Sequence, residues 1–527
     1  MKKNRILAML SVAAAAAILT ACAATPAPAP APAADPAAPQ AEAPAPAGGN
    51  GGTFQSNITM VFDVNIDSSD PQAFNNPQHR RLYMLTHTPL VVYHPETFEL
   101  MPGAALDWSV GEDLVTWTFN LRPGMEFHNG DTLTADDVLF TWERGMETSH
   151  TALRGIFNSV AEITVIDDLT IQMRLENPNM DFQYIISQPS YGILSRRAFA
   201  EDPESGYNVG TGAFMLRELV ESDFAIVERF DGFWDGPVPT ETITFRTMLE
   251  PAAALIALQN GEIDISVRTN PEEHAIVEGD PNLELIRFTG SSLNYLALNA
   301  SRYPTANQTL RNAIAYAINV DDIMLGAEGG HAVQANTFWG WDQFGYNPNI
   351  VPHPHDVDRA RELMIEAGFE DGLDLEIISF ATNYRLGAQI LQAQLREIGI
   401  NVIIREMDFS AATEYTTNLQ HDAILIGFSN HPFGDDSRRS HAPGIASNRS
   451  AMNNPEIMSL FDEAQQETNE QRRIELYQRI QEITREEAAA IPLYFNEIGM
   501  AVRRGLGGMW VEPGNAHNLT YAYILID

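Results

Sequence analysis

The stretch from residue 124 to residue 138 reads GMEFHNGDTLTADDV and contains a strand end, a tight turn and a helix start. Asn129-Gly130 is typical of a tight turn between strands, because both residues tolerate positive φ. Thr134 stands where it can cap a helix that opens with Ala135-Asp136-Asp137, whose carboxylates face the positive end of the helix dipole. The stretch therefore predicts two strand segments followed by a helix.

Antiparallel strands are expected on both sides of this stretch, in the first half of the chain. Apolar residues there alternate with polar ones, and turns such as Gly111-Glu112-Asp113 separate the segments. We expect these strands at Phe98–Trp108, Thr116–Leu121 and Ile163–Leu175.

From Leu293 onward, strands and helices alternate, which predicts an α/β fold with a doubly wound second half. Residues 356–367 form an amphipathic helix that Asp356 can cap and Gly368 ends. The other expected helices are 310–319, 385–398, 455–467 and 470–487. The expected strands are 293–299, 373–380, 401–407, 422–428, 492–496 and 521–526.

Two such halves joined by crossing segments place a cleft between two lobes, where small ligands bind. We expect lobe I at 53–288, with a β-rich subdomain at about 90–205. Lobe II is expected at 289–491, and residues 492–527 are expected to return to lobe I.

The composition excludes several classes of function. The 527 residues include 70 acidic and 32 basic side chains, and the formal net charge of -38 argues against a nucleic-acid partner. Cysteine occurs only at Cys22 and lysine only at Lys2 and Lys3, which excludes disulfides within the chain and, once the N-terminus is removed, a catalytic lysine. HExxH and GxSxG are absent as well, so an extracellular hydrolase would need a pair of carboxylates.

The N-terminus predicts a signal peptide followed by a lipid anchor. A basic start precedes an apolar run, residues 6–19, that is too short to span a bilayer. Residues 19–22, Leu-Thr-Ala-Cys, resemble the bacterial lipobox, in which the cysteine is acylated and becomes the first residue. We therefore expect a signal peptide at 1–21, lipidation of Cys22 and an Ala/Pro-rich tether to residue 52.

Seven segments, in order, resemble the family 5 extracellular solute-binding proteins, the dipeptide- and oligopeptide-binding group of ABC importers. The opening stretch is similar to the family's FHDGxPLTAEDV, and residues 358–369 are similar to DxxKAxxLLxEAGY, with Arg359 at the lysine position. The other five segments are 69–71, 102–108, 209–214, 258–264 and 310–318. We interpret most of them as scaffold; Gly210 and Gly212, for example, permit a close backbone crossing.

This resemblance implies a type II periplasmic-binding-protein fold, α/β, with two lobes, a hinge and an extra β-rich subdomain in the first lobe. It also implies a binding protein rather than an enzyme, one that captures a peptide or other small solute by domain closure and delivers it to the transmembrane subunits of an ABC permease. We expect a monomer, extracytoplasmic and held to the cell membrane by its lipid. An oligosaccharide or a metal chelate is the alternative solute, and a hydrolase is the alternative class of function.

Aromatic residues are concentrated between Phe338 and Tyr346, in the sequence FWGWDQFGY. The two glycines favour a loop, in which Trp339 and Trp341 present flat faces for stacking on a ligand. Packing of the same rings in the core is the alternative.

The segment DAILIGFSNHPFGDD, residues 422–436, is a strand that leads into a polar loop. In peptide binders of the resembled family an aspartate after this strand pairs with the ligand's α-ammonium, and counting from Phe428 places His431 at that position. Asp435 is a second candidate, if the loop folds back. Matched in the same way, the remaining pocket residues are Asn75, Asn76, Phe409, Phe428, Ser429, Asn430 and Tyr494.

Arginines supply the candidate contacts for an anionic group. Tyr384 and Arg385 open a helix and can meet a carboxylate there, although Arg385 can also be a plain surface residue. Arg438-Arg439 can do the same or can merely offset Asp435-Asp436. We expect no cofactor and no metal, because histidines two apart across a proline, as in His353-Pro354-His355, rarely converge on one ion.

Overall fold

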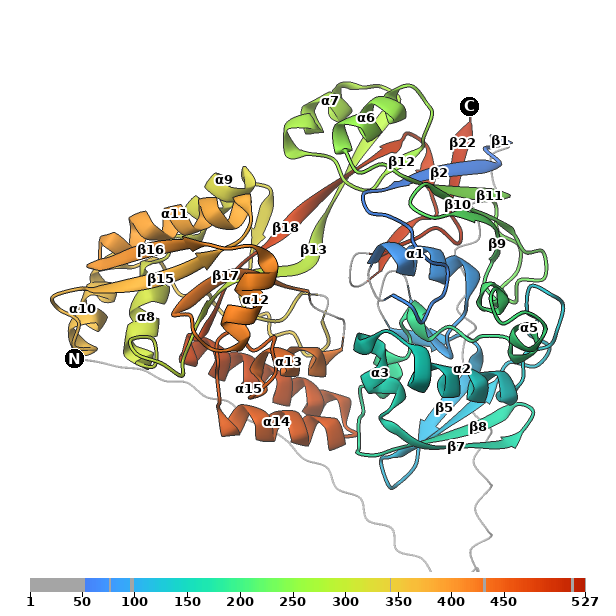
Figure 1. Cartoon of the computed structure of the whole chain (residues 1–527), viewed down its shortest axis with the longest axis horizontal. Helices are drawn as coiled ribbons and strands as arrows, with labels where there is room; N and C mark the ends of the chain where they lie inside the picture. The colour runs from blue at the N-terminus through green and yellow to red at the C-terminus, as the bar shows by residue number, and fades with distance from the viewer. Residues whose placement is uncertain are drawn as a thin grey trace, which may run out of the picture. The chain divides into compact units, whose positions relative to one another are not determined.

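The computed structural model describes residues 53–74, 77–94, 99–341, 343–429, 433–512 and 516–526. The expected signal peptide, Cys22 and the tether lie outside the described residues. The α/β fold is confirmed, and its main element is a mixed sheet of eleven strands (Figure 1). In spatial order the strands are β16 (Ile400–Glu406), β15 (Leu373–Ser379), β17 (Ala423–Ser429), β13 (Leu283–Leu298), β18 (Ala490–Arg503), β12 (Ile265–Ser266), β2 (Asn57–Phe62), β11 (Thr242–Thr247), β10 (Phe224–Arg229) and β9 (Phe214–Val220), and β14 (Ala332–Gln334) pairs with β18.

Strand β17 shows why helices cover both faces of this sheet. Successive side chains of a strand point to opposite faces, and all those from Ala423 to Leu425 are buried. Ala423 and Leu425 pack with the cluster that contains α8 (Gln308–Ala317), α9 (Val320–Glu328), α10 (Val357–Glu366) and α11 (Thr382–Arg396). Ile424 and Phe428 pack with the cluster that contains α12 (Phe409–Thr417), α14 (Pro455–Gln466) and α15 (Glu470–Glu487). Figure 1 shows α11 and α14 on opposite sides of these strands.

Strands β13 and β18 are long and contact four hydrophobic core clusters along their length. The sequence predicted only 293–299 and 492–496, whereas the strands have 16 and 14 residues. The additional half of β13 alternates apolar residues with charged ones, such as Glu284 and Arg287, so it has no continuous apolar run. The additional part of β18, residues 497–503, is mostly apolar but contains Gly499, a residue that is depleted in strands. The expected boundaries at 288/289 and 491/492 fall inside these two strands.

A separate four-stranded antiparallel sheet lies in the first half of the chain. Its order is β5 (Ala105–Val110), β6 (Thr116–Leu121), β8 (Thr170–Leu175) and β7 (Val160–Asp167). The predicted single strand 163–175 is wrong, because it is a hairpin: Asp167 Oδ1 accepts a hydrogen bond from the backbone N of Leu169 at 2.9 Å and turns the chain. Trp117 and Trp142 are fully buried in the core of this part.

The opening stretch has the predicted turn and helix start. Gly130 adopts φ +84°, and its backbone N donates to the Phe127 carbonyl at 2.8 Å. Helix α2 (Ala135–Thr148) follows Thr134, and Asp137 Oδ2 accepts from the Thr134 backbone N at 2.9 Å. Asp137 Oδ1 also accepts from the backbone N of Arg196 at 2.9 Å, so the stretch connects two helices of the scaffold.

The predicted close crossing at Gly210 and Gly212 is present as well. A Cβ on Gly210 would stand 2.0 Å from the carbonyl oxygen of Thr86, and one on Gly212 would stand 2.2 Å from that of Leu85. Both carbonyls belong to the last turn of α1 (Pro77–Thr86). Only glycine permits this contact between two backbones.

Candidate ligand-binding site

The parallel strands of the large sheet end together at one edge. Strand β15 is parallel to β16, with Leu373 opposite Ile400, and parallel to β17, with Ile377 opposite Ala423. Their last residues are Ser379, Glu406 and Ser429. We call this the carboxyl edge; in open α/β sheets ligands bind outside the carboxyl ends of the strands.

Aromatic side chains surround the carboxyl edge. The ring centroid of Phe380, the residue after β15, lies 4.7 Å from that of Tyr384 and 5.3 Å from that of Phe409. Phe409 begins α12 and remains 59% exposed. An exposed phenyl ring supported by a second ring is a surface on which a ligand can stack.

Tyr384 lies against the adjacent strand. A Cβ on Gly427 would stand 2.8 Å from the Tyr384 hydroxyl, so glycine at this position lets the phenol reach β17. Burial and the nearby Glu328 raise the pKa of Tyr384 to about 12. Tyr494 is fully buried, and its hydroxyl donates to Glu328 Oε1 at 2.8 Å. Tyr494 therefore supports the edge from within the core.

The end of β17 carries an anchored arginine. Arg439 Nε lies 2.8 Å from Asp436 Oδ1, and Nη2 donates to Asp436 Oδ2 at 3.2 Å and to the Ser429 carbonyl at 2.5 Å. The guanidinium carbon lies 4.2 Å from the ring centroid of Phe428. Phe428 is buried and Ser429 is exposed, so these two candidate residues occupy different environments.

The two candidate tryptophans also differ. Trp339 is fully buried, with its ring stacked on Phe461 at a centroid distance of 6.2 Å, as the core alternative described. Trp341 is 52% exposed. Only Trp341 therefore presents a face to solvent.

Asp435 belongs to a buried polar group that we call the Asp181 junction, made of Asp181, Asp435, Arg473 and Tyr477. Asp181 accepts hydrogen bonds from Arg473, from the Tyr477 hydroxyl at 3.0 Å and from the Asp435 backbone N at 2.8 Å. The Asp435 carboxylate accepts from Gln465 at 2.9 Å. Burial, followed by the charge of Asp181, raises the pKa of Asp435 well above its usual range. The carboxylate is thus directed to protein partners.

Arg385 is exposed, and no described residue forms an ion pair with it. The candidates Asn75, Asn76, Asn430 and His431 lie outside the described residues. In the part of the chain that the structure describes, no three His, Cys, Asp or Glu side chains are placed to hold a metal ion. No helix among these residues has the length and apolar character needed to cross a membrane.

Comparison with known proteins places this geometry in a family. The family model "Bacterial extracellular solute-binding proteins, family 5 Middle" matches residues 99–443, more than half of the chain. The chain belongs to this family. The family's solute-binding character accords with a site at the carboxyl edge of a doubly wound sheet.

Two relatives illustrate the range of family 5. The dipeptide-binding protein of Escherichia coli (strain K12) is 24% identical over 466 residues, which cover 81% of this chain and 87% of the relative. The glutathione-binding protein GsiB of Salmonella paratyphi A is 27% identical over 424 residues, which cover 77% and 82%.

Solved structures share the fold. HbpA2 from Haemophilus parasuis matches with a TM-score of 0.82 at 21% identity, covering 89% of this chain and all of that one. DppA from Helicobacter pylori, in complex with the peptide STSA, matches with a TM-score of 0.72 at 24% identity, covering 90% and 99%. At such identities the likeness establishes the architecture and not the ligand.

Two parts of this arrangement were missed from the sequence. Asp181 carries no local sequence signal, because its partner Arg473 lies 292 residues away. For Arg439 the sequence indicates only an anion contact or a counter-charge to Asp435-Asp436. The i, i+3 spacing of Asp436 and Arg439 signals their ion pair, but not the contacts with Ser429 and Phe428.

Proposed function

We propose that this protein is the extracytoplasmic solute-binding component of an ABC importer and that it captures an oligopeptide or similar small solute at the carboxyl edge. The observation that carries the proposal is the family match over residues 99–443, combined with exposed aromatic and polar side chains at that edge. The names of the relatives, which bind dipeptides and glutathione, favour peptides as the solute class.

In this proposal Phe409 and Trp341 stack on apolar parts of the solute, and Ser429 and Arg385 contact its polar groups. Tyr384 and Phe428 support these contacts from the sheet, and Asn75, Asn76, Asn430, His431 and Tyr494 complete the proposed set. Contacts from both lobes would favour a closed state, because a ligand shifts an equilibrium only by its differential affinity for the two states. Trp339 and Asp435 are packed against protein and have supporting roles.

The protein is proposed to hold its solute without altering it and to pass it to permease subunits. The motifs of common hydrolases are absent from the sequence, and the curated relatives are named for binding. We further propose that Cys22 carries the lipid that anchors a monomer to the cell membrane. The loss of membrane association in a Cys22→Ser variant, measured by fractionation of cells, tests the anchor separately from solute binding.

Calorimetric titration with defined di- to pentapeptides tests the proposed function. We expect saturable binding of at least some peptides and, by chromatography of the mixture afterwards, intact peptide. If the protein binds oligosaccharides or metal chelates but no peptide, the proposed solute class would change from peptides to those compounds. Appearance of hydrolysis products would replace the binding role with an enzymatic one.

A further inference from the structure

The guanidinium of Arg439 is held in place by more contacts than an ordinary surface arginine has. Asp436, its ion-pair partner, is 3% exposed and pairs through both oxygens. A third contact goes to the carbonyl of Ser429, and the Phe428 ring covers one face at 4.2 Å. Two fixed edges and a covered face leave the group little freedom to reorient.

The same side chain remains 40% exposed. Nε and Nη2 are used by Asp436 and Ser429, and no described residue accepts a hydrogen bond from Nη1. The two N–H groups of Nη1 are therefore available at the end of β17. Since Ser429 is the last residue of that strand, they lie at the carboxyl edge.

A fixed, planar donor at a ligand edge suits an anionic oxygen. Charge-assisted hydrogen bonds from a guanidinium are among the strongest in proteins, and a donor that is already immobilised loses little entropy on binding. A primary ammonium would meet a like charge at the same position. Neutral groups would gain only an ordinary hydrogen bond.

We propose that Arg439 determines specificity by receiving a carboxylate of the solute on its Nη1 edge. The inference rests on the proposed solute-binding function and narrows the solute to molecules with a carboxylate near an apolar group. Asp436 is then a positioning residue, because it orients the guanidinium without touching the solute.

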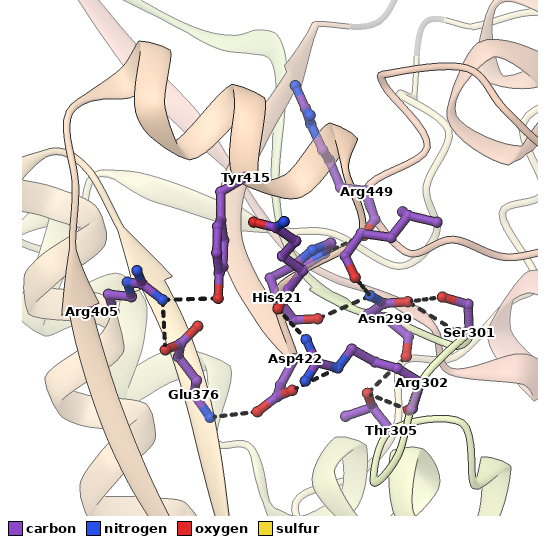
Figure 2. Close-up of polar contacts among 12 residues, drawn as sticks. Asn299, Ser301, Arg302, Thr305, Glu376, Arg405, Tyr415, His421, Asp422 and Arg449 are labelled. Atoms are coloured by element: carbon purple, nitrogen blue, oxygen red, sulfur yellow. Dashed lines mark hydrogen bonds and ion pairs between the residues drawn. The ribbon is translucent and has the colours of Figure 1, made fainter.

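Arg302 provides a matched control. It also pairs with a partly buried carboxylate, Asp422, at 3.4 Å (Figure 2). It donates to a backbone carbonyl as well, that of Gln420. Its side chain is 43% exposed, close to the value for Arg439. Asp422 directly precedes β17, so seven residues at about 3.3 Å each place Arg302 roughly 20 Å away, at the opposite edge of the sheet.

The experiment measures calorimetric affinities for acid and neutral pairs: Met-Leu and its C-terminal amide, glutathione and its diamide, and digalacturonate and its methyl ester. For whichever pair the wild-type protein binds, we expect the acid to bind about tenfold or more tightly than the neutral form. Arg439→Gln should lose that preference and leave the neutral form unchanged. Arg302→Gln should behave as the wild-type protein does.

The variant Arg439→Lys controls for a folding defect, because its ammonium still pairs with Asp436. We expect this variant to lose part of the preference for the acid and to keep the circular dichroism spectrum of the wild-type protein. Equal affinity of the wild-type protein for acid and neutral forms would overturn the role of Arg439 while leaving solute binding intact. The same conclusion follows if Arg439→Gln weakens both forms equally. Failure of every compound to bind the folded wild-type protein would overturn this inference together with the proposed function for these solutes.

Discussion

Removal of one member of the Asp181 junction should destabilise the protein far more than removal of a surface ion pair. The side chains of Asp181 and Arg473 are 1% and 4% exposed, so Asp181→Ala would leave an uncompensated guanidinium in the interior. It would also leave two donors, the Tyr477 hydroxyl and the Asp435 backbone N, without their acceptor. Breaking a buried pair costs about 3–5 kcal/mol, and each orphaned donor about 1–3 kcal/mol more. We expect a loss of at least about 4 kcal/mol.

Urea unfolding at pH 7, followed by circular dichroism, measures this loss as a change in the free energy of unfolding. The double variant Asp181→Leu with Arg473→Met should recover most of it, because two apolar side chains leave no charge unpaired. The control is Arg479→Met on α15, the helix that also carries Arg473. The ion pair of Arg479 with Glu482 at 3.0 Å is about half exposed and should contribute less than about 1 kcal/mol. A loss below about 1 kcal/mol for Asp181→Ala, or additive losses in the double variant, would refute the reasoning.

Three further variants or conditions test the scaffold. Gly210→Ala should cost more than about 2 kcal/mol because its Cβ would collide with a backbone carbonyl. Gly155→Ala, within helix α3 (Thr151–Phe157) and with no atom within 4 Å of the added Cβ, should cost no stability in the same urea assay and can gain up to about 1 kcal/mol. Asp137→Ala should cost about 2–3 kcal/mol through its lost hydrogen bonds, and the exposed Asp136→Ala much less, as thermal midpoints would show; equal shifts would contradict this. Burial lowers the pKa of four described histidines to about 4: His128, His353, His421 and His441. The unfolded chain binds protons at these groups below about pH 6.5 and the folded chain only near pH 4, so stability should fall as pH falls through this window, by up to about 1.4 kcal/mol per pH unit for each histidine. A His441→Gln variant with an unchanged slope would count against this assignment.

Local patterns predicted the regular elements of the α/β half closely. Helix α10 spans 357–366 against an expected 356–367, and Asp356 caps it by accepting from the Arg359 backbone N at 2.9 Å. Strand β17 is displaced by one residue from its expected range. Apolar periodicity and capping are carried by neighbouring residues, so they can be read without knowledge of the fold.

The candidate site is predicted less well from the sequence than the helices and strands are, because the role of each side chain depends on residues distant in sequence. The aromatic character of Trp339 and Tyr494 was a sound reason to consider them, yet both are buried against Phe461 and Glu328 respectively. Phe409, which only the family resemblance proposed, is 59% exposed at the start of α12.

Strand β13 has a consequence for any attempt to divide the molecule. It contributes Leu283 to one cluster, Phe288 to a second, Leu293 to a third and Leu296 to a fourth. A split-protein pair or a fusion made at residue 288 would therefore cut through a hydrogen-bonded ribbon and leave both fragments with open apolar surface. The strand is continuous at that point, although the expected boundary between the two lobes falls there.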